Sequence, residues 1–297
     1  MTAPVFFTDL GAPLTGGTVV VLSGDEAHHA AAAFRVSPGE VIEVVNGSGL
    51  RAIGTAMAVT ANRVEVAVDR VVTETPPARA ITLVQALAKH KRDEQAVSQA
   101  VELGVDRIIP WQAERSVVRW PPAKAGAGRA RWAALAKSAA KVARRAFLPP
   151  VEPLATTNQL ISRLATQPTG QPASQPTGLG TCQQPEPPTV FQAGQGQPDE
   201  PERAGEPKAA PGQAVVVLHE DASQSLPAWY AQWSASAEPS TGIVLLVGPE
   251  GGIDDLEIEA LQEGLGAAIV GLGPFVLRSS TAGPAALAAL SALTGRW

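Results

Sequence analysis

Three short loops in the last third of the chain carry the residues that could do chemistry. Two are rich in glycine and read Gly-Pro-Glu-Gly-Gly at residues 248–252 and Gly-Leu-Gly-Pro-Phe-Val-Leu-Arg-Ser-Ser-Thr-Ala-Gly at residues 271–283, and the third is His219-Glu220-Asp221. Backbone without side chains lets a ligand approach exposed N–H and C=O groups, which suits an adenosine-like ligand read by main-chain hydrogen bonds. Neither glycine-rich loop matches a common phosphate-binding, hydrolase or metalloprotease motif.

The second of these loops also holds a cation and three hydroxyl groups. Arg278 is followed by Ser279, Ser280 and Thr281, and then by Gly283-Pro284. Because Pro favours the first turn of a helix, we expect a helix over residues 285–293. We expect two of the three hydroxyls to cap that helix. Taken alone, residues 219–221 would be interpreted as a turn.

Short apolar runs precede all three loops and must position them. They cover residues 213–218, 243–247 and 267–270. A run rich in β-branched residues that stops at Gly or a polar cluster is typical of a buried parallel strand. Residues 81–87 and 105–110 are two further strands, joined by an amphipathic helix that ends at Gly104. Neighbouring parallel strands end at the same edge of their sheet, so the loops are expected to form one ligand crevice.

The first 75 residues have a different pattern and indicate a small β-barrel. Four short strands are predicted at residues 18–22, 40–45, 52–58 and 63–68, with one short helix over residues 25–36. His28 and His29 could face an RNA backbone, but packing within the helix is the favoured interpretation. Arg35 and Arg51 are better candidates for RNA contacts. Pro76-Pro77 is expected to begin the linker to a second domain.

The charge of the chain is unevenly distributed. The net charge is −5, yet residues 85–150 hold 13 Lys and Arg against 5 Asp and Glu, an excess of +8. Four of these cations, at 129, 137, 141 and 145, recur at helical spacing and form a basic stripe. A solvated helix face and a contact with nucleic acid both remain open on this evidence alone.

Composition restricts the remaining possibilities. A single cysteine, Cys182, allows no disulfide within the chain, and no apolar run approaches the roughly 20 residues that span a bilayer. A cytoplasmic protein is therefore expected, with neither a membrane nor a metal as partner. Residues 156–211 are rich in Gln, Pro, Gly, Thr and Ser, and we expect them to form a poorly ordered insertion in the second domain.

The two glycine-rich loops together resemble the C-terminal motif of the ribosomal RNA small subunit methyltransferase E family, which belongs to the SPOUT superfamily. Other segments are similar to the same family: Phe34-Arg35 with Pro38-Gly39-Glu40, Glu102-Leu103-Gly104-Val105 with Pro110 and Glu114-Arg115-Ser116, and Leu218-His219-Glu220. The resemblance covers most of the chain, and only residues 156–211 have no counterpart in it.

The resemblance implies an α/β protein of two domains. Residues 1–75 would form a PUA-like RNA-binding β-barrel, and residues 76–297 a SPOUT α/β domain with a trefoil knot around a parallel sheet. It also implies S-adenosyl-L-methionine as cofactor, the 16S ribosomal RNA of the small subunit as partner, and a homodimer. The implied reaction is methylation of N3 of a uridine. A non-catalytic factor that binds ribosomal RNA with the same fold is the alternative, and cofactor binding would distinguish the two.

Site residues follow from the resemblance position by position. The implied cofactor contacts, mostly from backbone, are His219, Glu220, Gly248, Glu250, Gly251, Leu272, Gly273, Leu277 and Ser279. Arg278 is the expected catalytic residue, since a cation beside O2 or O4 would stabilise the uracil anion. Arg35, Arg51, Arg115 and Arg145 are the expected RNA contacts. We expect Glu250 to shape its loop rather than act as an acid.

The chain departs from the family's usual motif at two positions. Ser280 stands where many members have Glu, which argues against that Glu being an obligatory general base. Val142 stands where a Gln is common in the basic helix, although Arg145 is retained. The second departure puts a direct role of this helix in orienting the target in doubt.

Overall fold

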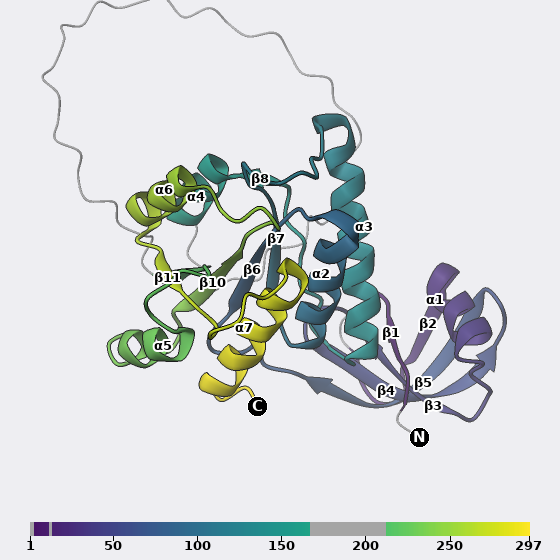
Figure 1. Ribbon diagram of the computed structural model, residues 1–297. Helices are drawn as coiled ribbons and strands as arrows, with labels where there is room; N and C mark the ends of the chain where they lie inside the picture. The colour runs from purple at the N-terminus through teal and green to yellow at the C-terminus, as the bar shows by residue number, and fades with distance from the viewer. Residues whose placement is uncertain (1–2, 12–13, 167–211) are drawn as a thin grey trace, which may run out of the picture.

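The computed structural model describes residues 3–11, 14–166 and 212–297, which form two sheets flanked by helices (Figure 1). Most of the insertion expected over residues 156–211 therefore lies outside the described residues. The N-terminal sheet has the strand order β1-β3-β4-β5-β2, and the C-terminal sheet has the order β11-β9-β10-β6-β7-β8. An α/β fold with one mixed and one parallel sheet is thus confirmed.

The N-terminal sheet confirms the four predicted strands and adds one. Its strands are β1 (Val5–Phe7), β2 (Val19–Ser23), β3 (Val41–Val45), β4 (Leu50–Val59) and β5 (Arg63–Thr73). β1 pairs with β3 in parallel, and the other pairs are antiparallel. The sheet bends where the β4–β5 register shifts at Gly54, where a Cβ would lie 2.2 Å from the Ala67 carbonyl oxygen. Only glycine fits this close approach of two strands.

The short helix after β2 differs from the expected one. It runs as α1 (Gly24–His28) into a π-helical turn, η1 (His29–Ala33), and so ends before residue 36. The ring of His29 packs edge-on against Phe34, with the ring centroids 5.2 Å apart. The interpretation of this histidine as a packing residue is supported by that contact.

The C-terminal sheet is entirely parallel and is covered on both faces. Its strands are β6 (Ile81–Ala86), β7 (Arg107–Gln112), β8 (Ala155–Thr156), β9 (Gln213–Leu218), β10 (Gly242–Val247) and β11 (Ala268–Val270). The helices are η2 (Lys89–Lys91), α2 (Arg92–Glu102), α3 (Pro122–Val142), α4 (Thr157–Thr166), α5 (Leu226–Ser234), α6 (Asp255–Leu265) and α7 (Ser279–Leu293). Figure 1 shows α2, α3 and α7 on one face of this sheet and α4 and α6 on the other.

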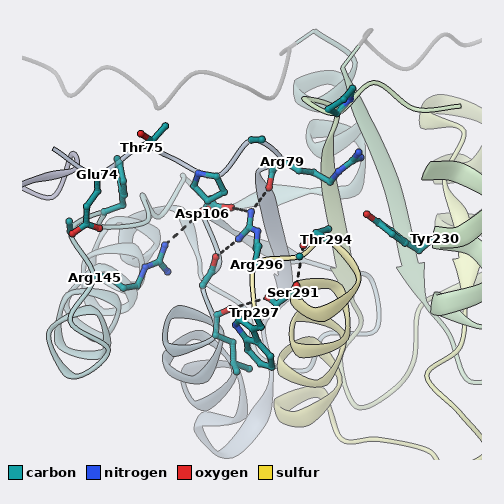
Figure 2. Close-up of a pocket in the computed structure, with 18 residues that line it drawn as sticks. Glu74, Thr75, Arg79, Asp106, Arg145, Tyr230, Ser291, Thr294, Arg296 and Trp297 are labelled. Atoms are coloured by element: carbon teal, nitrogen blue, oxygen red, sulfur yellow. Dashed lines mark hydrogen bonds and ion pairs between the residues drawn. The ribbon is translucent and has the colours of Figure 1, made fainter. Parts of the chain in front are cut away.

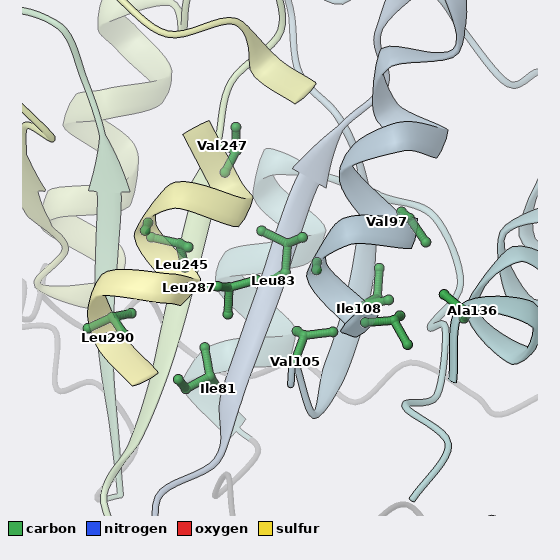
Figure 3. Packing of buried hydrophobic residues seen from close by; sticks show 14 of the residues in the cluster. Ile81, Leu83, Val97, Val105, Ile108, Ala136, Leu245, Val247, Leu287 and Leu290 are labelled. Atoms are coloured by element: carbon green, nitrogen blue, oxygen red, sulfur yellow. The ribbon is translucent and has the colours of Figure 1, made fainter. Parts of the chain in front are cut away.

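Alternating side chains of the buried strands pack into two cores. Ile81, Leu83 and Leu245 point to the face covered by α2, α3 and α7, where they meet Leu287 and Leu290 (Figure 3). The intervening residues of the same strands face α4 and α6. Both faces of the strands are thereby buried, which explains the continuous apolar runs of the sequence.

Helix α4 corrects the predicted start of the insertion. The residues from 157 to 166 are helical rather than poorly ordered, and Leu160 and Leu164 are 0% and 1% exposed. The side-chain amide of Gln213 donates a hydrogen bond to the carbonyl oxygen of Leu164. The described chain therefore leaves and re-enters the domain at nearby points.

Candidate functional site

The carboxyl ends of β9, β10 and β11 meet at one edge of the parallel sheet, as expected, because β9 lies between the other two. A cavity of about 640 Å³ opens there. Every residue implied as a cofactor contact lines it: His219, Glu220, Gly248, Glu250, Gly251, Leu272, Gly273, Leu277 and Ser279. Arg278 lines the same cavity. The structure thus brings together the three loops that the sequence keeps apart.

The start of α7 differs from the prediction. This helix begins at Ser279 rather than at residue 285, with Arg278 as its N-cap residue, and Pro284 lies inside the helix. No side chain makes a capping hydrogen bond at this end, so the hydroxyls expected to cap the helix do not. Ser279 is 6% exposed, and its Oγ has no hydrogen-bond partner among the described residues. Buried hydroxyls are normally paired, so this one is available to a ligand in the cavity.

Arg278 is the cation of the cavity that has no partner of its own. It is exposed, and no side-chain hydrogen bond or ion pair engages it within the described ranges. Phe275 and Val276, on the same loop, are 81% and 75% exposed. Ser280, which replaces the family's Glu, is 5% exposed and is not among the cavity's lining residues. The side chain at position 280 therefore does not offer a base to the cavity.

Glu250 ties the Gly-Pro-Glu-Gly-Gly loop to the end of a fourth strand. Its Oε1 accepts hydrogen bonds from the Lys89 backbone N–H at 3.1 Å and from the Arg92 guanidinium at 3.2 Å. These contacts support a role in shaping the loop, because the carboxylate is already engaged by two donors. Arg92, which also lines the cavity, was not predicted as a site residue. The sequence does contain a signal for Arg92, because it follows the strand at residues 81–86 and the ends of parallel strands line the ligand crevice.

His219 and Arg115 both line the cavity. The Asp221 backbone N–H donates to Nδ1 of His219 at 3.2 Å, which places the proton of the neutral ring on Nε2. Arg115, predicted as an RNA contact, lines the cavity and pairs with Asp254 at 3.0 Å. Its side chain remains 45% exposed, so it can still meet a large ligand at the cavity's edge.

Two lysines of the basic stripe on α3 pair with an acid of the N-terminal domain. Lys137 and Lys141 pair with Glu26 at 2.7 and 2.8 Å, and Phe7 donates its backbone N–H to the same carboxylate at 3.2 Å. Burial alone would raise the pKa of Glu26, but the hydrogen bonds and charges of the two lysines outweigh it and hold that pKa below its ordinary value. Two of the four cations of the stripe, Lys137 and Lys141, therefore join the two domains.

Arg51 and Arg145, two of the predicted RNA contacts, are also engaged within the protein. Arg51 pairs with Glu43 at 2.5 Å and with Glu74 at 2.6 Å, and its side chain is 12% exposed. Arg145 donates to the backbone carbonyls of Val101 and Val105 at 2.9 and 2.7 Å. These placements do not support RNA contacts for either arginine. Arg35 is exposed and has a left-handed backbone conformation, with φ of 53°. Its side chain is accessible, so a contact between Arg35 and RNA stays a prediction.

A second cavity, of about 680 Å³, lies at the opposite edge of the sheet near the C-terminus (Figure 2). Its arginines are engaged: Arg296 reaches the Gly104 carbonyl at 2.8 Å and Asp106 at 2.6 Å, and Arg79 donates to the Thr241 carbonyl at 3.0 Å. We interpret this cluster as the anchor that holds the end of α7 against the sheet. None of the three loops reaches it.

Within residues 3–11, 14–166 and 212–297, no cluster of three or more His, Cys, Asp or Glu has a geometry that could hold a metal ion. In the same ranges, no helix is both long and apolar enough to cross a membrane.

Known proteins resemble both the sequence and the fold. A model of the RNA methyltransferase domain matches residues 74–173 and 203–291. The chain is 35% identical to the ribosomal RNA small subunit methyltransferase E of Mycobacterium bovis, and the match covers 100% of this chain and 94% of the relative. It is 26% identical to the protein of the same name from Bacillus subtilis, and that match covers 91% of this chain and 88% of the relative. The crystal structure of the Neisseria gonorrhoeae ribosomal RNA small subunit methyltransferase E bound to S-adenosyl methionine superposes with a TM-score of 0.71 at 25% identity and covers 98% of each chain.

Proposed function

Because this chain belongs to the ribosomal RNA small subunit methyltransferase E family, we propose that it transfers a methyl group from S-adenosyl-L-methionine to N3 of a uridine in 16S ribosomal RNA. The observation that carries the proposal is the single cavity lined by all three strand-end loops and by Arg278. The alternative is an RNA-binding factor that has the same fold but transfers no methyl group. That alternative gives no role to the unpaired guanidinium of Arg278 in the cavity.

The residues of the cavity fit S-adenosyl-L-methionine. Its volume of about 640 Å³ lies within the usual range for small-molecule sites. Exposed backbone at Gly248, Gly251 and Gly273 would hold the nucleoside, and the unpartnered Oγ of Ser279 offers a hydrogen bond to a polar atom of the same ligand. When bound, the cofactor supplies a methyl group already activated by a positively charged sulfur.

The protein's own contribution concerns the target base. N3 of uracil carries a proton with a pKa a few units above neutral, and exposing the anion at pH 7 costs roughly 3–4 kcal/mol at 1.36 kcal/mol per unit. A guanidinium held beside O2 or O4 recovers much of that free energy by stabilising the developing negative charge. Arg278 is the candidate, since it lines the cavity and its guanidinium has no hydrogen-bond or ion-pair partner among the described residues. For N3 to accept the methyl group, its proton must leave to solvent or to a base of the RNA–protein complex, and the bond from the methyl carbon to the cofactor's sulfur would break, leaving a neutral thioether.

The wider architecture is proposed on the same family membership. The five-stranded sheet of residues 5–73 is proposed to be a PUA-like barrel that positions ribosomal RNA, with Arg35 as an exposed contact. We propose that the C-terminal domain is knotted and that the protein acts as a homodimer. Ribosomal RNA as substrate places the proposed reaction in the cytoplasm.

Replacing Arg278 tests the catalytic assignment. Arg278→Ala should cut the methylation rate by at least about 100-fold, the scale of losing one preorganised charge donor, and leave the cofactor dissociation constant within a few-fold. Arg70→Ala is the matched control, because Arg70 is an exposed arginine far from the cavity-lining loops. Methylation is measured by transfer of a labelled methyl group to small-subunit ribosomal RNA, and cofactor binding by calorimetry. Near-wild-type turnover of Arg278→Ala eliminates the assignment, and absence of cofactor binding by the wild-type protein favours the non-catalytic alternative.

A further inference from the structure

We propose that the cationic loop, defined as Lys89-His90-Lys91-Arg92, binds the phosphate backbone of the RNA substrate beside the cofactor cavity. The proposal rests on the proposed function, since it assumes an RNA target, and it moves the main RNA contact of the second domain away from the basic stripe of α3. None of the four residues was among the predicted RNA contacts.

The position of the loop is set by the cofactor site itself. The loop follows the end of β6, which lies next to β10 in the sheet. Glu250, which lines the cavity, accepts from the Lys89 backbone N–H at 3.1 Å and from the Arg92 guanidinium at 3.2 Å. A phosphate bound by this loop therefore lies beside the opening through which a target base must enter.

Lys89 and Lys91 of the loop lack a counter-charge among the described residues, whereas two of the four cations of the stripe are paired. Lys89, His90 and Lys91 are exposed, and across the described residues no hydrogen bond or ion pair engages their side chains. On α3, by contrast, Lys137 and Lys141 share the carboxylate of Glu26. Cations must be free to displace the counterions of a polyanion if they are to contribute binding free energy. Lys89 and Lys91 are therefore uncompensated cations of the basic middle region, and they stand next to Arg92, which lines the cavity.

The backbone of the loop is strained and held in place. His90 and Lys91 both adopt left-handed conformations, with φ of 57° and 58°, which disfavour side chains and suit glycine. Asp93, only 5% exposed, fixes the loop by accepting from the backbone N–H groups of Ala88 at 3.2 Å and Glu94 at 2.8 Å. The chain therefore has His90 and Lys91 at two positions where glycine would adopt the left-handed conformation with less conformational strain. Backbone strain of this kind is found where function needs a preorganised group.

The chemistry fits a contact that positions RNA without reading its sequence. Lysine ammonium groups bind phosphate oxygens as point charges, and such contacts set the register of a nucleic acid on a protein. Base identity would then be read inside the cavity. The loop thus holds the RNA strand beside the exposed uridine.

The test is the salt dependence of RNA binding by Lys89→Gln/Lys91→Gln. Binding of the full-length protein to a small-subunit ribosomal RNA fragment is measured by fluorescence anisotropy from about 50 to 200 mM salt. Loss of two contacts to single-stranded RNA should reduce the slope of log K against log salt by about 1.4 and weaken binding at low salt by at least about tenfold. Lys89→Arg/Lys91→Arg keeps the charges and should restore both values. Calorimetry with S-adenosyl-L-methionine should give an unchanged affinity, which shows that the fold is intact.

The matched control removes two charges elsewhere. Lys124→Gln/Arg70→Gln replaces two exposed cations that have no ion pair within the described ranges, one on α3 and one on β5. The proposal is overturned if the loop variant loses no more slope or affinity than this control. Because RNA binding is the readout, a wild-type protein that binds RNA but transfers no methyl group refutes the proposed function and leaves this proposal standing. Methyl transfer with an RNA affinity insensitive to the loop refutes only this proposal.

Discussion

Replacing Glu26 tests whether the basic helix serves the protein or the RNA. The Glu26 carboxylate is 11% exposed and pairs with Lys137 and Lys141, whose side chains are 41% and 16% exposed. Glu26→Gln keeps the shape of the side chain and leaves both ammonium groups without a counter-charge. Breaking a buried pair costs about 3–5 kcal/mol, while an exposed pair contributes about 0.2–1 kcal/mol. Because one lysine is largely buried and the other is not, we expect a loss of about 2–4 kcal/mol in the free energy of unfolding.

Urea unfolding followed by tryptophan fluorescence measures that loss, and its pH dependence adds a second check. The lysines lower the pKa of Glu26 from its ordinary value of 4.5, so its contribution is fully present above pH 4.5 and is lost as the pH falls through the lowered pKa. The difference between wild type and Glu26→Gln should therefore shrink in acid. Glu65→Gln is the control, because Glu65 forms an exposed pair with Arg63. A loss no larger than that of Glu65→Gln, independent of pH, would refute the interdomain role of the stripe and return its lysines to the candidates for RNA binding.

Two further predictions concern the cavity and the insertion. Gly248→Ala should weaken the binding of S-adenosyl-L-methionine, measured by calorimetry, because the added Cβ would lie 2.6 Å from Cγ1 of the buried Ile253. Gly271→Ala is the control and should bind the cofactor normally, because its Cβ would meet nothing closer than 3.7 Å. Equal affinities of the two variants would contradict the packing argument. Deleting residues 168–210 should leave methylation intact, because Gln213 and Leu164 on the two sides of the insertion already contact each other. Deleting residues 160–210 also removes the buried Leu160 and Leu164 and should lower the melting temperature. Equal melting temperatures of the two deletion variants would contradict the assignment of α4 to the core.

The parallel sheet and its cavity were predictable because their signals are local. Each strand end is marked by an abrupt change from β-branched residues to Gly, Pro or charge, as at Val247-Gly248. Parallel pairing then brings the ends together without further information. Pro284 indicates a first helical turn near residue 285, but α7 begins at Ser279 and accommodates this proline inside the helix. Helix α4 was missed because its polar composition outweighed the i, i+4 pair Leu160 and Leu164.

The role of the charged residues could not be predicted in the same way. Whether a cation is free depends on acids that lie far away in the chain, as Glu26 and Glu43 do for Lys141 and Arg144. Helical spacing reveals that α3 has a basic face, but not that this face meets the N-terminal domain. The cationic loop is unpredictable for the same reason, since its backbone conformation and its contact with the distant Glu250 have no local signature in the sequence.

Mapping the methylated nucleotide tests the central claim most directly. The full-length protein is incubated with labelled S-adenosyl-L-methionine and small ribosomal subunits, and the modified nucleoside is identified by mass spectrometry. The proposed function predicts a single uridine methylated at N3, with the label lost in Arg278→Ala and retained in Arg70→Ala. Methylation at a carbon or ribose oxygen, or transfer that survives the loss of Arg278, would contradict the proposed chemistry.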